Sequence, residues 1–167
     1  MAVNEAQDRA ATAGPLVVAL ADEAATAALA ARLAPLLKPR DVVALSGGLG
    51  AGKTSFARAL LRALGHTGEV PSPTFTLVQV YELAVGTVWH VDLYRLAAPD
   101  EALELGIEEA FAEAIVLIEW PDRLGTLLPP DRLDLHLDLA GGTARRATLS
   151  GGPSWRDRLA GLARSAG

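Results

Sequence analysis

Residues 47–54 carry the clearest chemical pattern in this 167-residue sequence, Gly-Gly-Leu-Gly-Ala-Gly-Lys-Thr. The pattern matches the phosphate-binding motif G-x-x-x-x-G-K-[ST] at each of its fixed positions. Glycines let backbone N–H groups surround phosphate oxygens, and a helix that begins near Lys53 directs its positive dipole end toward the same anion. Lys53 would reach the β- and γ-phosphates, and the Thr54 hydroxyl would bind magnesium.

The residues around this loop predict a site for ATP and Mg²⁺ rather than a flexible glycine-rich turn. A β-branched, apolar run at residues 41–45 predicts a buried strand before the loop, and apolar side chains at helical spacing over 54–64 predict a helix after it. Lys38 and Lys53 are the only lysines in the chain, which argues against a chance match. The residues predicted to contact the nucleotide are Gly47, Gly48, Leu49, Gly50, Ala51, Gly52, Lys53, Thr54 and Ser55.

Two acidic residues end predicted strands and compete for a place beside the magnesium ion. Glu119 follows the wholly apolar residues 114–118, as expected of a central strand next to the loop strand, so we predict that Glu119 lies on the magnesium side. Asp92 follows residues 88–91 and is predicted to support a metal-bound or attacking water. Exposure to solvent at a strand end is the alternative for either acid. His90 shares a strand face with Asp92, and a structural role explains it as well as a catalytic one.

Residues 72–76, Ser-Pro-Thr-Phe-Thr, form a rigid, hydroxyl-rich segment between the predicted helix and the next strand. In phosphate-loop switches such a segment places a hydroxyl against the γ-phosphate and magnesium. We predict this role for Thr74. An ordinary turn into a strand explains the same residues equally well.

The composition describes one packed domain without special covalent chemistry. Half of the residues are hydrophobic and 21% are charged, which is typical of a globular chain. The absence of cysteine excludes disulfides, thiolate catalysis and cysteine-ligated zinc. The net charge of −5 argues against independent binding to RNA. Charged residues interrupt the alanine-rich beginning, so we expect no signal peptide, no membrane span and a cytoplasmic location.

Strands that alternate with helices and hairpins predict an α/β fold, a mixed parallel and antiparallel sheet flanked by helices. Residues 75–83 and 87–93 predict one hairpin. Residues 133–139 alternate apolar and polar side chains, and with 144–149 they predict a second antiparallel hairpin at a sheet edge. The predicted organisation is a flexible tail at 1–14, a phosphate-loop ATPase domain at 15–150, and a C-terminal helical segment at 151–167. This segment is predicted to pack on the domain or to extend from it, with Trp155 and Leu159 inward.

Five segments, taken in order, resemble the TsaE family, the small bacterial ATPases of tRNA threonylcarbamoyladenosine (t6A) biosynthesis. They are 49–54 (Leu-Gly-Ala-Gly-Lys-Thr), 72–77 (Ser-Pro-Thr-Phe-Thr-Leu), 90–96 (His-Val-Asp-Leu-Tyr-Arg-Leu), 104–107 (Glu-Leu-Gly-Ile) and 118–121 (Ile-Glu-Trp-Pro). The resemblance spans roughly residues 20–139. Many families share the phosphate loop, whereas the set that includes Asp-Leu-Tyr-Arg-Leu and Ile-Glu-Trp-Pro is specific.

The resemblance implies an ATPase that supports t6A synthesis together with the proteins TsaD and TsaB, which would also make most of the contact with tRNA. It implies that the magnesium ligands are Thr54 and Glu119, that Asp92 takes part in hydrolysis, and that residues 72–76 are a switch. It also implies that Glu23 lies near the adenine end of the nucleotide.

One position departs from the family pattern, and it keeps other functions open. The family usually has aspartate where this chain has Gly48, so any contact of that aspartate with water or the γ-phosphate is lost. A nucleotide-binding scaffold without turnover is therefore one alternative. A small-molecule kinase is another, although the sequence shows no arginine-rich lid. A GTPase is disfavoured because the chain lacks an Asn-Lys-x-Asp motif.

Overall fold

The computed structural model describes residues 14–73 and 77–165. The strands are β1 (Leu16–Leu20), β2 (Val42–Gly47), β3 (Val78–Leu83), β4 (Gly86–Asp92), β5 (Ile115–Glu119), β6 (Leu133–Leu139) and β7 (Arg145–Gly151). The α-helices are α2 (Glu23–Leu33), α3 (Lys53–Ala63), α4 (Asp100–Glu104), α5 (Ile107–Glu113) and α6 (Arg156–Ser165). Short 3₁₀ helices are η1 (Ala34–Leu36), η2 (Pro121–Leu127) and η3 (Pro153–Trp155).

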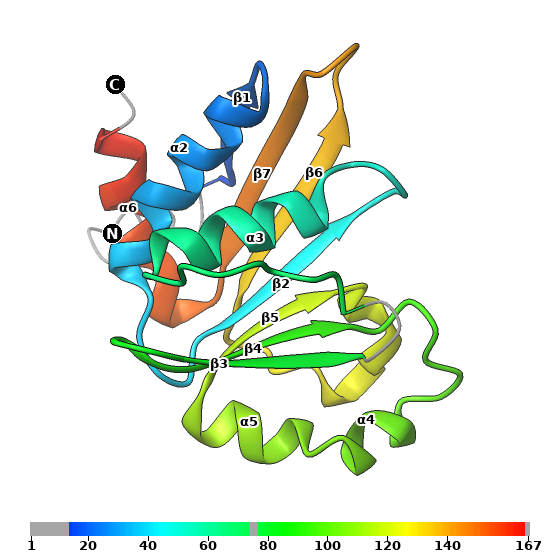
Figure 1. Ribbon diagram of the computed structural model, residues 1–167. Coiled ribbons are helices and arrows are strands. Elements are labelled where there is room, and N and C mark those ends of the chain that lie inside the picture. The colour runs from blue at the N-terminus through cyan, green and yellow to red at the C-terminus, as the bar shows by residue number, and fades with distance from the viewer. Residues whose placement is uncertain (1–13, 74–76, 166–167) are drawn as a thin grey trace, which may run out of the picture.

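The strands form one mixed sheet in the order β1-β7-β6-β2-β5-β4-β3 (Figure 1). The four inner strands β6, β2, β5 and β4 are parallel, and antiparallel pairs flank them on both sides. The predicted α/β class with a mixed sheet is confirmed. The parallel centre matters for function, because ligands of such sheets bind beyond the carboxyl ends of the parallel strands.

The predicted position of the second hairpin is wrong. β6 and β7 do form an antiparallel hairpin, but β1 pairs with the outer side of β7, and β6 pairs in parallel with β2. The alternation in β6 has a different cause. Leu133, Leu135 and Leu137 are buried, whereas the side chains of Asp134, His136 and Asp138, on the other face, stay 41–46% exposed. Alternation reports burial on one face of a strand and carries no information about its lateral neighbours.

Two apolar clusters cover the two faces of the sheet. The larger one packs α2, α3 and α6 against one face through side chains such as Leu29, Phe56 and Leu162. The smaller one packs α4 and α5 against the other face through Ala102 and Ile107. Figure 1 shows these two groups of helices on opposite sides of the strands. The larger cluster therefore seats α3, the helix that follows the phosphate loop.

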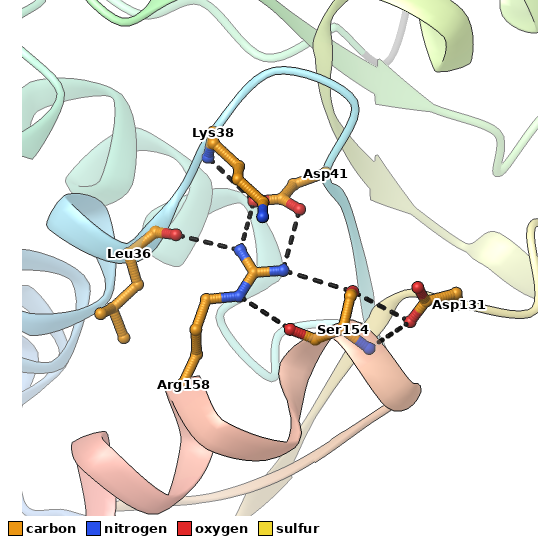
Figure 2. Close-up of polar contacts among 6 residues, drawn as sticks. All are labelled: Leu36, Lys38, Asp41, Asp131, Ser154 and Arg158. Atoms are coloured by element: carbon orange, nitrogen blue, oxygen red, sulfur yellow. Dashed lines mark hydrogen bonds and ion pairs between the residues drawn. The ribbon is translucent and has the colours of Figure 1, made fainter.

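The C-terminal helix α6 is held to the beginning of β2 by a buried ion pair (Figure 2). Two guanidinium nitrogens of Arg158 donate to the Asp41 carboxylate at 2.6 and 3.1 Å, and the Lys38 N–H donates to the same carboxylate at 2.8 Å. The Trp155 ring is buried as predicted, with the Arg158 guanidinium carbon 3.6 Å from its centroid. β7 runs to Gly151, so the last strand overlaps the predicted C-terminal segment by one residue.

None of the helices within residues 14–73 and 77–165 is long and apolar enough to cross a lipid bilayer.

Candidate functional site

The loop between β2 and α3 has a backbone that requires glycine at defined points. Gly47 has a φ of 142°, and a Cβ there would lie 2.5 Å from the carbonyl oxygen of Leu137 on the neighbouring strand β6. Gly52, the residue before α3, has a φ of 106° in the left-handed region. These conformations bring the loop across the carboxyl end of β2. The first N–H groups of α3 have no acceptor within the helix, so they are available to an anion.

Lys53 is buried at the start of α3, with only 5% of its surface exposed. Its ammonium donates to the carbonyl oxygens of Gly47 and Gly48 at 2.8 Å each, and it lies 4.2 Å from the centroid of the Trp120 ring. Burial lowers the pKa of Lys53 from 10.5, while the Glu119 and Asp92 carboxylates act in the opposite direction. Two neutral carbonyl oxygens therefore hold the ammonium inside the site, and the two nearby carboxylates favour its charged form.

Thr54 and Glu119 meet directly, although 65 residues separate them. The Thr54 hydroxyl donates to Oε1 of Glu119 at 2.6 Å. The contact follows from sheet order, because β5 is the parallel neighbour of β2 and Leu45 pairs with Glu119. The prediction that the Glu119 strand lies beside the loop strand is therefore confirmed. The other carboxylate oxygen, Oε2, lies 2.7 Å from Nε2 of the fully buried His90.

Asp92 ends β4 and pairs across the ladder with Glu119. Its side chain is 4% exposed, and Oδ1 accepts a hydrogen bond from the Tyr94 N–H at 3.0 Å. The alternative that either strand-end acid faces solvent is wrong, because both Asp92 and Glu119 are buried.

A cavity of about 330 Å³ opens between these residues. Lys53, Thr54, Asp92 and Glu119 line it together with parts of the loop, and Tyr94 and Trp120 form an aromatic wall. The two rings lie 5.1 Å apart, and Trp120 has a left-handed backbone with a φ of 60°. Sequence reasoning missed both rings as wall residues, although the Asp-Leu-Tyr-Arg-Leu and Ile-Glu-Trp-Pro segments contain them.

A larger cavity of about 510 Å³ lies between α2, α3 and the start of β7. Glu23 lines it, and so do Gly52 and Ser55, which also line the smaller cavity. The structure therefore brings the predicted Glu23 close to the loop, and Ala51 lies in this cavity as well. Pockets for small ligands usually measure about 300–1,000 Å³, so each cavity is large enough for part of a nucleotide.

Arg145 is a cavity residue that the sequence did not suggest. Its guanidinium donates to the carbonyls of Ala51 at 3.1 Å and Gly50 at 3.3 Å, which ties the start of β7 to the phosphate loop. The only local signal is the turn at residues 141–142 just before it, and such a turn says nothing about a contact 94 residues away. Thr74, predicted to face the γ-phosphate, lies outside the described residues.

The oxygen donors at this site suit magnesium. Thr54 and Glu119 offer a hydroxyl and a carboxylate that already touch, and Mg²⁺ is usually bound by one or two such groups with waters and phosphate oxygens completing its shell. Within residues 14–73 and 77–165, no group of three or more His, Cys, Asp or Glu side chains gathers as a metal cluster. The donor set therefore fits an ion bound together with a nucleotide, and it does not resemble a self-contained metal centre.

Comparison with known proteins decides the family. The family model described as "Threonylcarbamoyl adenosine biosynthesis protein TsaE" matches residues 20–147, more than half of the chain. The chain belongs to the TsaE family. The proteins named tRNA threonylcarbamoyladenosine biosynthesis protein TsaE from Rickettsia felis and Bacillus subtilis are 41% and 39% identical to it. Those alignments cover 78% and 75% of this chain and 77% and 78% of the relatives.

A solved structure supports the same assignment of the fold. The crystal structure of Bacillus subtilis YdiB superposes with a TM-score of 0.79 at 31% sequence identity, over 92% of this chain and 97% of that one. The TsaE match contains each of the site residues described here, from Glu23 to Arg145. It ends before α6, so Arg158 lies outside it.

Proposed function

We propose that this chain binds ATP with Mg²⁺ and hydrolyses it in support of t6A synthesis on tRNA, acting with TsaD and TsaB. The observation that carries the proposal is the 2.6 Å contact between Thr54 and Glu119 beside the buried Lys53. This arrangement combines a cation for phosphate, two oxygen donors for the metal and a helix start for the anion. The family description supports the place of the reaction in t6A biosynthesis.

The two cavities suggest how the nucleotide lies. The triphosphate would occupy the cavity that contains Lys53 and Asp92, and the nucleoside would occupy the larger cavity beside Glu23. Lys53 would exchange its bonds to the Gly47 and Gly48 carbonyls for phosphate oxygens, which are charged and therefore stronger acceptors. Arg145 would hold the loop in place through the carbonyls of Gly50 and Ala51.

Hydrolysis requires a water molecule oriented toward the γ-phosphate. We assign this task to Asp92, because it lines the phosphate cavity at the end of β4, beside Glu119. Bound magnesium supplies positive charge that offsets the negative charge developing on the phosphate oxygens. Thr54 and Glu119 would hold that ion. Trp120 and Tyr94 line the same cavity and would flank the bound phosphates.

The cellular setting follows from the same proposal. The chain has no cysteine, which fits a reducing compartment, and we place the activity in the cytoplasm. The net charge of −5 favours indirect contact with tRNA through TsaD and TsaB.

The test is steady-state ATP hydrolysis by the purified full chain, alone and with a TsaD–TsaB complex. We expect slow turnover that the complex stimulates strongly, and no turnover above background in Lys53→Ala. Asp92→Asn should keep its ATP affinity and lose about 100-fold or more in rate. Full activity in Lys53→Ala would remove the site assignment. Tight ATP binding with no turnover under either condition would favour a scaffold, the alternative that Gly48 keeps open.

A further inference from the structure

His90 contacts Glu119 inside the protein, at the point where β4 and β5 approach the phosphate loop. The imidazole is 0% exposed, and its Nε2 lies 2.7 Å from Oε2 of Glu119. In the parallel ladder, His90 pairs with Leu117 and Asp92 pairs with Glu119. Strand alternation places these four side chains on the face that packs against α3, so the ring reaches the carboxylate from the adjacent strand.

Of the two ring nitrogens of His90, Nε2 makes a hydrogen bond and Nδ1 makes none within residues 14–73 and 77–165. An ionised carboxylate only accepts hydrogen bonds, so the proton of the contact is carried by Nε2. Nδ1 is buried and has no hydrogen-bond partner within residues 14–73 and 77–165. A buried polar atom without a partner is rare in folded proteins and calls for an explanation. Among the described residues, the polar contact of this ring is with Glu119.

The two oxygens of Glu119 are therefore held by different residues. Oε2 accepts a hydrogen bond from the His90 imidazole, and Oε1 accepts one from the Thr54 hydroxyl. We propose that His90 is a positioning residue, which fixes the Glu119 carboxylate so that Oε1 faces the magnesium position next to Thr54. This inference rests on the proposed function, because it concerns the ion that accompanies ATP.

Lys53 explains why such a residue is needed. Its positive charge acts on Glu119, and a carboxylate with a free oxygen would turn toward the ammonium. That ion pair would occupy both the phosphate-binding lysine and the metal-binding acid. With Oε2 bonded to His90, Glu119 keeps its hydrogen bond with Thr54, and Lys53 keeps its bonds to the Gly47 and Gly48 carbonyls. Glu119 can then bind magnesium, and Lys53 can bind phosphate.

Two substitutions distinguish positioning from simple packing. In His90→Gln the amide nitrogen lies about as far along the side chain as Nε2, so it can still donate to Glu119. In His90→Asn the amide nitrogen reaches only the place of Nδ1 and cannot make the contact. The two variants share a neutral amide and differ in reach alone. Loss of an outer partner of a metal ligand typically weakens metal binding by about 10–100-fold.

The experiment is a Mg²⁺ titration of the full chain with a fluorescent ribose-labelled ATP analogue, read as binding and not as turnover. We expect the Mg²⁺ concentration at half effect to rise by about 10–100-fold in His90→Asn and to stay within a few-fold of the natural protein in His90→Gln. Affinity for the analogue in EDTA should be equal in all three proteins. Circular dichroism melting checks that each variant is folded. If His90→Asn does not fold, His90→Leu removes the donor while filling the site.

A folded His90→Asn or His90→Leu protein with an unchanged Mg²⁺ midpoint would overturn the positioning role and leave the proposed function intact. Equal midpoint shifts in Gln and Asn variants would also overturn it, because the effect would then not depend on reach. If the natural protein binds the analogue without any influence of Mg²⁺, or does not bind it, the proposed function fails and the inference fails with it.

Discussion

Asp41 and Glu119 are both buried carboxylates, yet their surroundings differ in kind. Asp41 precedes β2 and Glu119 ends the parallel neighbour β5, so the two lie at opposite ends of the same strand pair. Asp41 receives two bonds from the Arg158 guanidinium and one from a backbone N–H. Glu119 accepts hydrogen bonds from a hydroxyl and an imidazole, and no guanidinium within residues 14–73 and 77–165 bonds to either oxygen.

Under the proposed function, this difference separates a structural carboxylate, Asp41, from the carboxylate proposed to bind a cation, Glu119. Arg158 supplies the counter-charge of Asp41 and bonds to both of its oxygens, and Figure 2 shows how Ser154 and Leu36 bind the same guanidinium. Near Glu119 the ammonium of Lys53 interacts electrostatically with the carboxylates of both Glu119 and Asp92. A buried charge without full compensation is costly unless a ligand completes it. Asp41, which is paired with a guanidinium, lies just before the start of β2, and Glu119, which contacts a hydroxyl and an imidazole, lies at the end that carries the phosphate loop.

The largest expected effect comes from Glu119→Gln, which keeps the shape of the side chain and removes its charge. ATP hydrolysis with TsaD–TsaB should fall by at least about 100-fold. Loss of an outer partner of a metal ligand costs up to about that much, and Glu119 is proposed to bind the ion directly. The melting temperature should hold or rise, because an amide costs less to bury than a carboxylate. Hydrolysis assays and thermal melts measure both quantities. A variant that melts much earlier yet keeps its activity would assign Glu119 a structural role and break the comparison.

The matched change at the other carboxylate, Asp41→Asn, should have the reverse result. It leaves Arg158 without its counter-charge at a largely buried position, and we expect a loss of about 3 kcal/mol in unfolding free energy. For a chain of this size that loss corresponds to a fall of roughly 6–12 °C in melting temperature. ATP affinity at a temperature where the variant is folded should be unchanged.

Asp157→Asn is the control for the Asp41 experiment, because Asp157 is an exposed acid on the same helix as Arg158. It should leave the melting temperature nearly unchanged. Equal melting temperatures for Asp41→Asn and the natural protein would show that the Arg158 pair contributes nothing to folding.

The smallest expected effect is at Gly48, where a substitution tests whether an added carboxylate near the phosphate loop increases ATP hydrolysis. A Cβ at Gly48 would meet no atom within 4 Å, so Gly48→Asp should fold normally and add a carboxylate at the position where the family has one. Partner-stimulated hydrolysis should rise about threefold to tenfold, equivalent to up to about 1.4 kcal/mol in the barrier. Gly48→Ala separates the carboxylate from the added carbon. An equal rate in both variants would show that the family aspartate is not what limits turnover here.

Several parts of the molecule were determined by the sequence on its own. The phosphate loop, the helix after it and the buried strand before Glu119 all depend on residues close together in the chain. Local periodicity, capping side chains and glycine requirements are properties of short segments, so they can be recognised without the fold. The choice of Lys53, Thr54 and Glu119 as candidate site residues came from such patterns, and their roles remain predictions.

Only the tertiary structure decided which distant residues meet. The contacts of Thr54 with Glu119, Arg145 with Ala51, and Arg158 with Asp41 join positions 65, 94 and 117 residues apart. The sequence also could not predict that β1 pairs with the outer side of β7, or that His90 contacts Glu119. A residue pattern reports how a segment is buried, while its neighbours depend on strand order and on the packing of the whole sheet. The sequence therefore named the candidate groups, and the fold determined that one buried carboxylate pairs with an arginine while the other contacts a threonine hydroxyl and an imidazole.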